Sequence, residues 1–170
     1  AHVGAINEAL AIDDGQELIL MAEALQERKL SLIADAIVRH STRRPLVLIA
    51  GPSSSGKTTF SRRLSIQLRV LGLNPYTISA DDYYVDRERN PRHPDGSYDF
   101  EALAAIDTDL LGQHLTALLD GDPIDLVRFD FVSGKRVPTG QSYAMADDSI
   151  LIIEGIHGLN DRLTPRIPKE

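Results

Sequence analysis

The spacing of apolar and polar positions changes at Pro45 and divides the chain in two. Residues 16–39 place apolar side chains at roughly helical intervals with charges between them, which predicts one long amphipathic helix or two short ones. The apolar positions of this pattern are Leu18, Ala22, Leu25, Ile33 and Ile37. The polar stretch from His40 to Pro45 interrupts it. We therefore expect residues 1–44 to be an N-terminal helical segment or linker that precedes a domain at residues 45–170.

After Pro45, short apolar runs alternate with longer helical patterns. The strand-like runs are residues 46–50, 75–80 and 149–153, and the helical patterns are residues 58–71 and 103–119. Continuous apolar runs are typical of strands that are buried on both faces of a parallel sheet. Alternating strands and helices connect by right-handed crossovers, which place helices on both sides of such a sheet. The pattern therefore predicts an α/β domain with a parallel sheet and flanking helices.

A short β-hairpin is predicted in addition to the parallel sheet. Residues 124–132 and 136–141 have the character of two short strands, and Ser133-Gly134-Lys135 lies between them. A glycine-containing turn of this length between two strands is a hairpin signal. We therefore expect the domain to contain a short β-hairpin as well as the parallel sheet.

Composition narrows the class of partner. The formal net charge is −7, whereas proteins that coat nucleic acid or anionic lipid normally carry a basic face. The chain has no cysteine, which excludes disulfides and Cys-ligated metal sites. Its longest apolar stretches are too short to span a bilayer. We expect a cytoplasmic protein that binds small molecules, with no nucleic acid and no membrane as partner, and leave open whether it forms a homo-oligomer.

Residues 51–58, Gly-Pro-Ser-Ser-Ser-Gly-Lys-Thr, follow the first strand-like run and open a helical pattern. This spacing is that of a phosphate-binding loop, whose glycines let backbone N–H groups point at phosphate oxygens, and the positive end of the helix adds to the attraction. We expect the nucleotide to contact Gly51, Ser53, Ser54, Ser55, Gly56, Lys57, Thr58 and Thr59. Lys57 would reach the β- and γ-phosphates, and the Thr58 hydroxyl would bind Mg²⁺. The sequence thus predicts a P-loop NTPase-type fold that uses ATP and Mg²⁺.

Two acidic residues follow the other strand-like runs. Asp81 comes after residues 75–80, and Glu154 comes after residues 149–153. Ligands of parallel sheets bind beyond the carboxyl ends of the strands, where a carboxylate can hold Mg²⁺ or accept a proton from an attacking hydroxyl. Asp81 is therefore a candidate catalytic residue beside Lys57, and Thr58, Asp81 and Glu154 are candidate metal ligands. A solvated acid that caps a loop is the alternative, and for Asp82, whose side chain should point the other way, both interpretations stay open.

The histidines show no metal-ligand spacing. We expect His93 and His114 to be exposed on a loop and on a helix. His157 follows the Glu154-Gly155 turn and could approach the phosphates, although a loop contact is the preferred prediction.

Three segments together resemble a known family. They are residues 49–59 (Ile-Ala-Gly-Pro-Ser-Ser-Ser-Gly-Lys-Thr-Thr), residues 79–84 (Ser-Ala-Asp-Asp-Tyr-Tyr) and residues 153–156 (Ile-Glu-Gly-Ile). Their order and spacing resemble those of the uridine kinase and phosphoribulokinase family, over about residues 45–163. The chain looks most similar to bacterial uridine-kinase-like proteins in which this domain follows a TGS region, and the helices before Pro45 would then be the tail of that upstream part.

The resemblance implies an ATP-dependent phosphotransferase that moves the γ-phosphate to a hydroxyl of a small molecule, a nucleoside as in uridine kinases. It implies that Asp81 is the base for the ribose 5′-hydroxyl and that Glu154 is a second acid associated with Mg²⁺. Asp99 would hold ribose hydroxyls, and Tyr84 would lie beside the sugar. The hairpin segment 129–136 would cradle the base.

The chain departs from the family at the base-binding hairpin. Uridine kinases place a Tyr where Phe129 stands and a His where Gly134 stands, and both make polar contacts with the pyrimidine. Losing hydrogen bonds to a buried base can change specificity by orders of magnitude. Phe131 keeps an aromatic ring for stacking, while Arg128 or Arg136 either binds a polar or anionic acceptor or only forms the charged rim of the hairpin. The predicted acceptor-binding residues are Tyr84, Asp99, Phe129, Phe131 and Arg136.

A second departure concerns length. In the family, further strands, an arginine-bearing lid and much of the adenine contact surface follow the Glu-Gly-Ile segment, whereas this sequence ends about 15 residues later. Such arginines normally meet the charge on the transferring phosphoryl group. We therefore expect domain 45–170 to be C-terminally incomplete, and this polypeptide alone to bind nucleotide weakly and to turn over poorly.

Other functions remain open at this point. One alternative is a kinase of a sugar phosphate or another small alcohol. A second alternative is a non-catalytic nucleotide-binding module that has kept the phosphate loop. A GTPase switch is disfavoured, because the sequence has no Asn-Lys-x-Asp motif for reading guanine.

Overall fold

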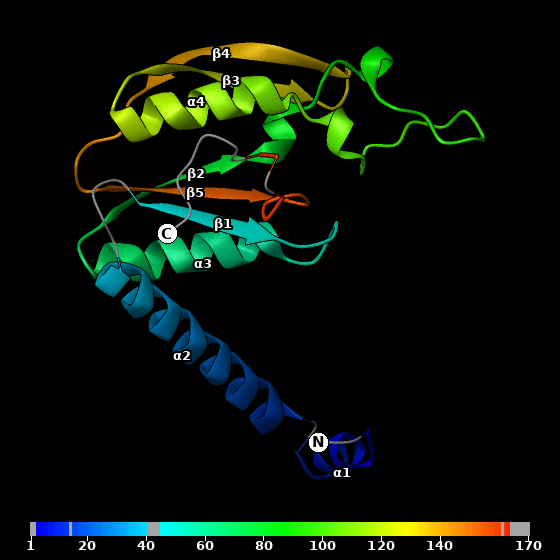
Figure 1. The fold of residues 1–170 in the computed structure, drawn as a ribbon. Helices are drawn as coiled ribbons and strands as arrows, with labels where there is room; N and C mark the ends of the chain where they lie inside the picture. The colour runs from blue at the N-terminus through cyan, green and yellow to red at the C-terminus, as the bar shows by residue number, and fades with distance from the viewer. Residues whose placement is uncertain (1–2, 14, 41–44, 161, 164–170) are drawn as a thin grey trace. The chain divides into compact units, whose positions relative to one another are not determined.

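The computed structural model describes residues 3–13, 15–40, 45–160 and 162–163, which fall into two compact units, Ala1–His40 and Ser41–Glu170. The first unit contains α1 (Val3–Asp13) and α2 (Gln16–His40) (Figure 1). The amphipathic pattern of residues 16–39 therefore forms one long helix, which decides between the two predicted possibilities. Helix α1 was not predicted, because its apolar side chains do not gather on one face and so leave no helical period. The predicted junction at residues 41–44 lies outside the described residues.

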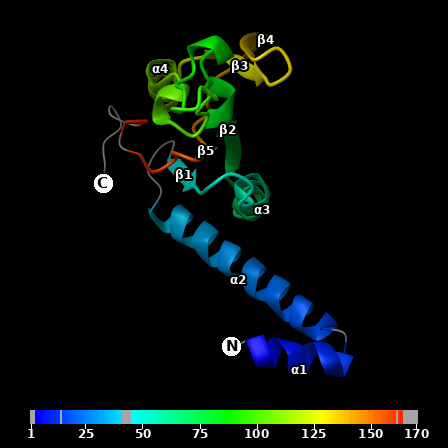
Figure 2. The same cartoon turned by 90° about the vertical axis from the view of Figure 1, so that its right-hand side faces the viewer.

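The centre of the second unit is a parallel sheet of three strands. Its strands are β1 (Leu46–Ala50), β5 (Ser149–Gly155) and β2 (Asn74–Ser79), with β5 in the middle. All seven residues of β5 are buried, because this strand has a neighbour on each side and is covered on both faces. The continuous apolar runs had predicted this parallel sheet, and the prediction is confirmed. Figure 2 looks onto the carboxyl ends of the strands, where the candidate site lies.

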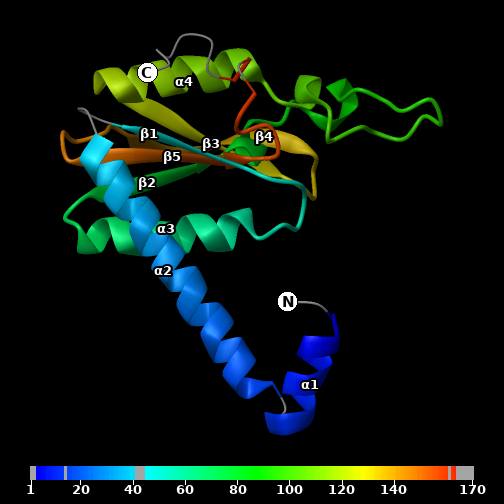
Figure 3. The same ribbon diagram turned by 60° about the horizontal axis from the view of Figure 1, so that its bottom comes forward.

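Two helices cover opposite sides of this sheet, α3 (Lys57–Val70) and α4 (Thr108–Asp120) (Figures 1 and 3). Helix α3 buries Leu64 and Leu68 completely, and α4 buries Leu111, Leu115 and Leu118 completely. Each fully buried leucine contributes about 1.5–3 kcal/mol relative to an exposed one, so these apolar stripes hold the helices on the sheet. Among the described residues, no helix combines the length and apolar character that crossing a bilayer requires.

The predicted helix over residues 103–119 was wrong at its start. Leu103–Ala105 is a short 3₁₀ turn, and the extended backbone of Ile106 pairs with Tyr84 in an isolated antiparallel bridge. Helix α4 begins only at Thr108, where the side chain of Asp107 accepts a hydrogen bond from Leu110 N at 3.1 Å. Apolar spacing alone suggested a longer helix, but the pairing with Tyr84 requires extended backbone that a helix cannot supply.

The predicted hairpin is present as β3 (Ile124–Asp130) and β4 (Lys135–Tyr143), which pair antiparallel. Its tip is closed by Asp130, whose carboxylate accepts hydrogen bonds from Val132 N and Ser133 Oγ. Strand β4 is longer than predicted, and its last residue, Tyr143, stacks on Tyr76 of β2 with ring centroids 3.6 Å apart. This stacking attaches the open end of the hairpin to the edge of the sheet.

Candidate active site

The predicted phosphate loop connects the carboxyl end of β1 to the first residue of α3. Its backbone enters the left-handed region at Ser54 (φ 59°) and again at Gly56 (φ 88°), which a glycine adopts without strain and a serine rarely does. Ser55 N donates to Pro52 O at 3.3 Å, and Phe60 N donates to Gly56 O at 2.9 Å to open the helix. Residues Ser53 to Gly56 are exposed, so the loop and the helix N-terminus form an anion-binding geometry open to a ligand.

Lys57 and Thr58, the first two residues of α3, turn their side chains toward different parts of the site. The Lys57 ammonium donates to Pro52 O at 2.9 Å and so folds back over the loop. The Thr58 hydroxyl donates to Glu154 Oε1 at 3.0 Å. The second bond joins the phosphate loop to β5 across 96 residues of sequence.

Glu154 lies at the carboxyl end of the central strand. In the sheet register it stands between Ile49 of β1 and Ser79 of β2, and only 7% of its surface is exposed. A carboxylate this deep needs a compensating partner, which the Thr58 hydroxyl supplies in part. The predicted proximity of Glu154 to the phosphate loop is therefore present in the structure.

Asp81 follows β2 directly, in the 3₁₀ turn η1 (Ala80–Tyr83). Burial raises the pKa of its carboxyl, the neighbouring charge of Glu154 raises it further, and Lys57 lowers it. The three predicted charged residues thus act on one another at the same edge of the sheet. Two carboxylates that repel each other beside a cationic loop form a site that would favour a bound cation.

The donor set of this edge fits Mg²⁺. It comprises the Thr58 hydroxyl and the carboxylates of Asp81 and Glu154, which are all oxygen ligands of the kind that Mg²⁺ prefers. The described residues contain no cluster of three or more acidic or histidine side chains in ligating arrangement. Mg²⁺ usually takes only one or two carboxylates and completes its shell with waters and substrate phosphates, so two acids and a hydroxyl suffice here.

Asp82 points away from this site, as its position next to Asp81 had suggested. Its Oδ1 accepts a hydrogen bond from Phe129 N of β3 at 3.4 Å. Burial raises the pKa of the Asp82 carboxyl, and the Phe129 N–H opposes that rise. Asp82 therefore connects the turn that carries Asp81 to the hairpin.

Four aromatic residues form a cluster next to Asp81, and we call Tyr84, Phe100, Phe129 and Phe131 the aromatic cluster. The Tyr84 ring centroid lies 6.1, 5.5 and 6.3 Å from those of Phe100, Phe129 and Phe131. Burial raises the pKa of Tyr84 to about 12, with contributions from Asp81 and Glu101. Phe129 is 3% exposed and Phe131 is 61% exposed, so the cluster has a closed base and an open rim.

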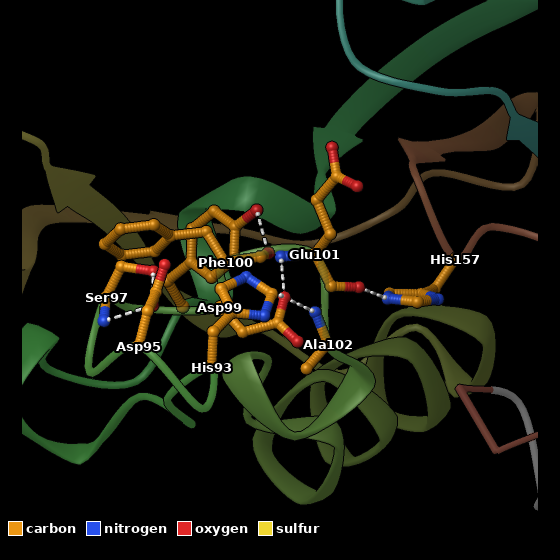
Figure 4. A network of polar contacts seen from close by, with 9 residues as sticks. His93, Asp95, Ser97, Asp99, Phe100, Glu101, Ala102 and His157 are labelled. Carbon is orange, nitrogen blue, oxygen red and sulfur yellow. Dashed lines mark hydrogen bonds and ion pairs between the residues drawn. The ribbon is translucent and has the colours of Figure 1, made fainter.

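Asp99 lies in a turn beside the aromatic cluster, which we call the acceptor turn (residues 99–102). Its Oδ1 accepts hydrogen bonds from Glu101 N and Ala102 N, both at 3.0 Å, and lies 3.8 Å from His93 Nε2 (Figure 4). One carboxylate oxygen of Asp99 thus shapes the turn itself. The predicted contact of Asp99 with ribose hydroxyls stays a prediction.

The guanidinium of Arg136 is engaged within the protein. Its Nη1 pairs with Asp107 Oδ2 at 2.9 Å, and its backbone N–H donates to Asp86 Oδ1 at 3.2 Å. Asp107 is the residue that caps α4, so this ion pair ties the hairpin to the helix. The predicted role of Arg136 in acceptor binding is untested, and it would require the guanidinium to leave Asp107 or to bind a second anion.

Arg87 is a residue of the site that sequence reasoning missed. It lies in the turn η2 (Arg87–Arg89), its guanidinium donates to Phe131 O at 2.5 Å, and its N–H donates to Gly134 O at 2.8 Å. Gly134 has φ 70°, and a Cβ there would lie 2.7 Å from Arg87 Nε. Arg87 therefore occupies the space that a side chain at position 134 would take. No local sequence pattern predicts a contact between Arg87 and Gly134, because the two residues are far apart in the sequence.

His114 was also misjudged. It was predicted to be exposed, but it is half-buried on α4, and its Nδ1 lies 2.9 Å from the hydroxyl of Tyr83. Tyr83 is 2% exposed and follows Asp82 in η1. The contact between Tyr83 and His114 thus attaches the turn that carries Asp81 to α4. It depends on the tertiary fold and has no local sequence signal.

Comparison with known proteins agrees with this geometry. The family model described as Phosphoribulokinase / Uridine kinase family matches residues 46–166. A uridine kinase from Deinococcus deserti is 35% identical over 120 residues, which are 69% of this chain and 56% of that protein. A uridine kinase from Schizosaccharomyces pombe is 37% identical over 118 residues, which are 66% of this chain and 24% of that protein. The chain thus spans about half the length, or less, of these relatives.

Among solved structures, the fold is similar to that of a protein described as a possible uridine kinase from Bacillus stearothermophilus. The TM-score is 0.68 at 23% identity, and the match covers 81% of this chain and 75% of that one. The likeness supports the P-loop kinase fold of the parallel sheet and its phosphate loop. The phosphate loop, the two acids at the strand ends and the family match over most of the chain agree, and the chain belongs to the Phosphoribulokinase / Uridine kinase family.

Proposed function

We propose that the natural protein transfers the γ-phosphate of ATP to a hydroxyl group of a small molecule, and that this acceptor is a nucleoside. The observation that carries the proposal is the hydrogen bond from Thr58 to Glu154, which brings the phosphate loop and an acid of the neighbouring strand to one point. Asp81 shares the electrostatics of that point. We place the acceptor hydroxyl at Asp81, whose carboxylate has the charges of Glu154 and Lys57 as neighbours.

In this mechanism, the loop residues hold the phosphates and Lys57 swings from Pro52 O to the β- and γ-phosphates. The acceptor hydroxyl oxygen forms a bond to the γ-phosphorus, the bond to the β-γ bridging oxygen breaks, and ADP leaves. Asp81 accepts the proton that the hydroxyl loses. Mg²⁺ bound at Thr58, Asp81 and Glu154 would offset the charge of the phosphates.

The nucleoside assignment rests on the relatives named uridine kinase and on the aromatic cluster. The exposed ring of Phe131 packs against buried Tyr84 close to Asp81, and aromatic rings next to a base contribute about 1–3 kcal/mol by stacking. Asp99, Tyr84, Phe129 and Phe131 are our proposed acceptor contacts.

One observation favours a second acceptor class, a sugar phosphate or another anionic alcohol. Arg87 covers Gly134 at the rim of the aromatic cluster, and no carboxylate among the described residues is paired with its guanidinium. A guanidinium that has no carboxylate partner is well suited to binding a phosphate or carboxylate group. Replacing Arg87 by Gln would lower turnover of sugar phosphates and leave nucleosides unaffected if this second class is correct.

The test of the proposed function is phosphoryl transfer by the natural-length protein with ATP and a panel of nucleosides and sugar phosphates. Asp81→Asn should lower transfer by about 10²–10⁴-fold, the usual contribution of a general base, and keep ATP binding. Asp122 is an exposed residue after α4, and Asp122→Asn is the matched control. It should show the same phosphoryl transfer and ATP binding as the wild type. Equal transfer by the Asp81→Asn variant and the wild type would contradict the mechanism, and ATP binding without any transfer would favour a non-catalytic module.

A further inference from the structure

Two side chains hold the acceptor turn, and each comes from a segment that carries a site acid. The Tyr84 hydroxyl donates to Phe100 O at 3.0 Å, and His157 Nε2 contacts Glu101 O at 2.7 Å. Tyr84 lies three residues after Asp81, and His157 lies three residues after Glu154. The consecutive carbonyls of Phe100 and Glu101 are thus hydrogen-bonded to the segments that follow β2 and β5. These are the segments next to Asp81 and Glu154.

The hydrogen bond of His157 has a defined direction. A carbonyl oxygen only accepts, so Nε2 must carry the proton and donate. In Figure 4 the imidazole of His157 points at the Glu101 carbonyl, from the side of the turn away from His93. His157 is therefore a donor to the turn, which is the loop contact that the sequence predicted.

The segment that carries His157 is itself firmly placed. Gly158 N donates to Gly155 O at 3.3 Å, and Asn160 N donates to His157 O at 2.7 Å. A Cβ on Gly158 would lie 2.6 Å from the carbonyl oxygen of Ile49 in β1, so this backbone lies directly against the strand that leads into the phosphate loop. The imidazole consequently extends from a fixed base on the sheet.

Glu101 transmits this position to Asp99. The Glu101 carbonyl, which His157 binds, and the Ala102 N–H, which Asp99 Oδ1 binds at 3.0 Å, belong to the same peptide unit. A displacement of this peptide therefore displaces the carboxylate of Asp99. Among the described residues, the side chains of Tyr84 and His157 are the ones that donate to carbonyls of this turn.

We propose that His157 is a positioning residue that sets the place of Asp99 relative to the phosphate side of the site. This inference rests on the proposed function, because it assigns Asp99 to the acceptor. His157 acts through the peptide unit that joins Glu101 to Ala102, and it does not touch the reacting atoms. Its loss should weaken acceptor binding and leave nucleotide binding unchanged.

The kinetic test compares three variants of the natural-length protein, His157→Ala, His157→Gln and His40→Ala. Uridine is the first acceptor, and if uridine is inactive, the best acceptor of the panel replaces it. His157→Ala should raise the acceptor KM about fivefold or more, the ratio expected for one lost hydrogen bond, with the Kd for ATP unchanged. His157→Gln keeps an N–H donor and should restore most of the affinity. His40 lies on α2, in the other compact unit, and its variant should match the wild type.

A double-mutant cycle decides whether His157 acts through Asp99. In an Asp99→Asn background, His157→Ala should cause little further rise of the acceptor KM, because the carboxylate that it positions is gone. A full additional fivefold rise would overturn the proposal. An equal loss of ATP affinity in the single variant would also overturn it, because it would indicate general damage to the site.

A second measurement keeps the inference testable if no acceptor in the panel is phosphorylated. Fast amide exchange by NMR should be about fivefold faster at Glu101 and Ala102 in His157→Ala, since both N–H groups depend on the Asp99 carboxylate. His157→Gln should exchange at the wild-type rate. Unchanged exchange at these two amides, or faster exchange throughout the second unit, would refute the proposal independently of any kinase activity.

Discussion

The phosphate loop and the aromatic cluster both have Asp81 as a neighbour, but they are built in different ways. The loop is a contiguous stretch between one strand and one helix, and within the described residues a hydrogen bond from Thr58 to Glu154 joins it to β5. The aromatic cluster collects side chains from three separate segments and depends on contacts such as Tyr84 OH to Phe100 O. Local backbone geometry and sheet register position the first region, whereas side-chain contacts between loops position the second. Substitutions should therefore separate nucleotide effects from acceptor effects.

The largest expected effect is on the phosphate side. Lys57→Met should lower the rate of phosphoryl transfer by about 10²–10³-fold, the usual cost of removing one group that stabilises transition-state charge, and should weaken ATP binding. Lys135→Met, at the start of β4, removes an equal charge beside the aromatic cluster and should leave ATP binding unchanged. Isothermal titration with ATP and a steady-state assay measure both. Similar losses of ATP affinity in the two variants would mean that the comparison between the regions is wrong.

On the phosphate side of the site, Glu154→Gln should lower ATP affinity without lowering the melting temperature of the protein. The amide oxygen can still accept the Thr58 hydrogen bond, but one of two mutually repelling carboxylates is removed, since Glu154 raises the pKa of Asp81. We expect Mg²⁺-dependent ATP affinity to fall about 10–100-fold, while the melting temperature without nucleotide stays constant or rises. A clear fall in that melting temperature would show that Glu154 is needed for folding.

The same difference explains how far the sequence could predict the molecule. The parallel sheet, the hairpin and the nearness of Asp81 and Glu154 to the loop followed from apolar runs and from one motif, because strand ends of a parallel sheet meet at one edge. Arg87 over Gly134 and His114 behind Tyr83 could not be predicted, because each contact joins segments whose packing has no local signature. The start of α4 was missed because pairing of Ile106 with Tyr84 overrides the helical spacing.

Within the aromatic cluster, burial should separate stability from acceptor binding. Phe129→Ala removes a ring that is 3% exposed and should cost about 3–5 kcal/mol in the free energy of unfolding. Phe131→Ala removes a ring that is 61% exposed, should change stability by less than about 0.5 kcal/mol, and should raise the acceptor KM about tenfold through lost stacking. Urea denaturation and acceptor kinetics distinguish the two. If Phe131→Ala leaves the acceptor KM unchanged, the open rim of the cluster is not the acceptor site.

The smallest expected effect concerns the pH dependence of stability at the contact behind Asp81. Burial lowers the pKa of His114 below its usual value, Arg136 lowers it further, and Asp125 and Asp107 oppose them. The folded state therefore favours neutral His114, whose Nδ1 is then able to accept a hydrogen bond from Tyr83, whereas the unfolded chain protonates this histidine as the pH falls below about 6.5. Stability from this group is present above that pH and is lost as the pH falls through the folded-state pKa.

In His114→Gln, whose amide oxygen can still accept from Tyr83, the fall in melting temperature between about pH 7.5 and 5.5 should be smaller than in the wild type. His40→Gln, in the other compact unit, should keep the full fall. An identical pH profile for the wild type and His114→Gln would mean that the half-buried imidazole does not limit the acid stability of the turn that carries Asp81.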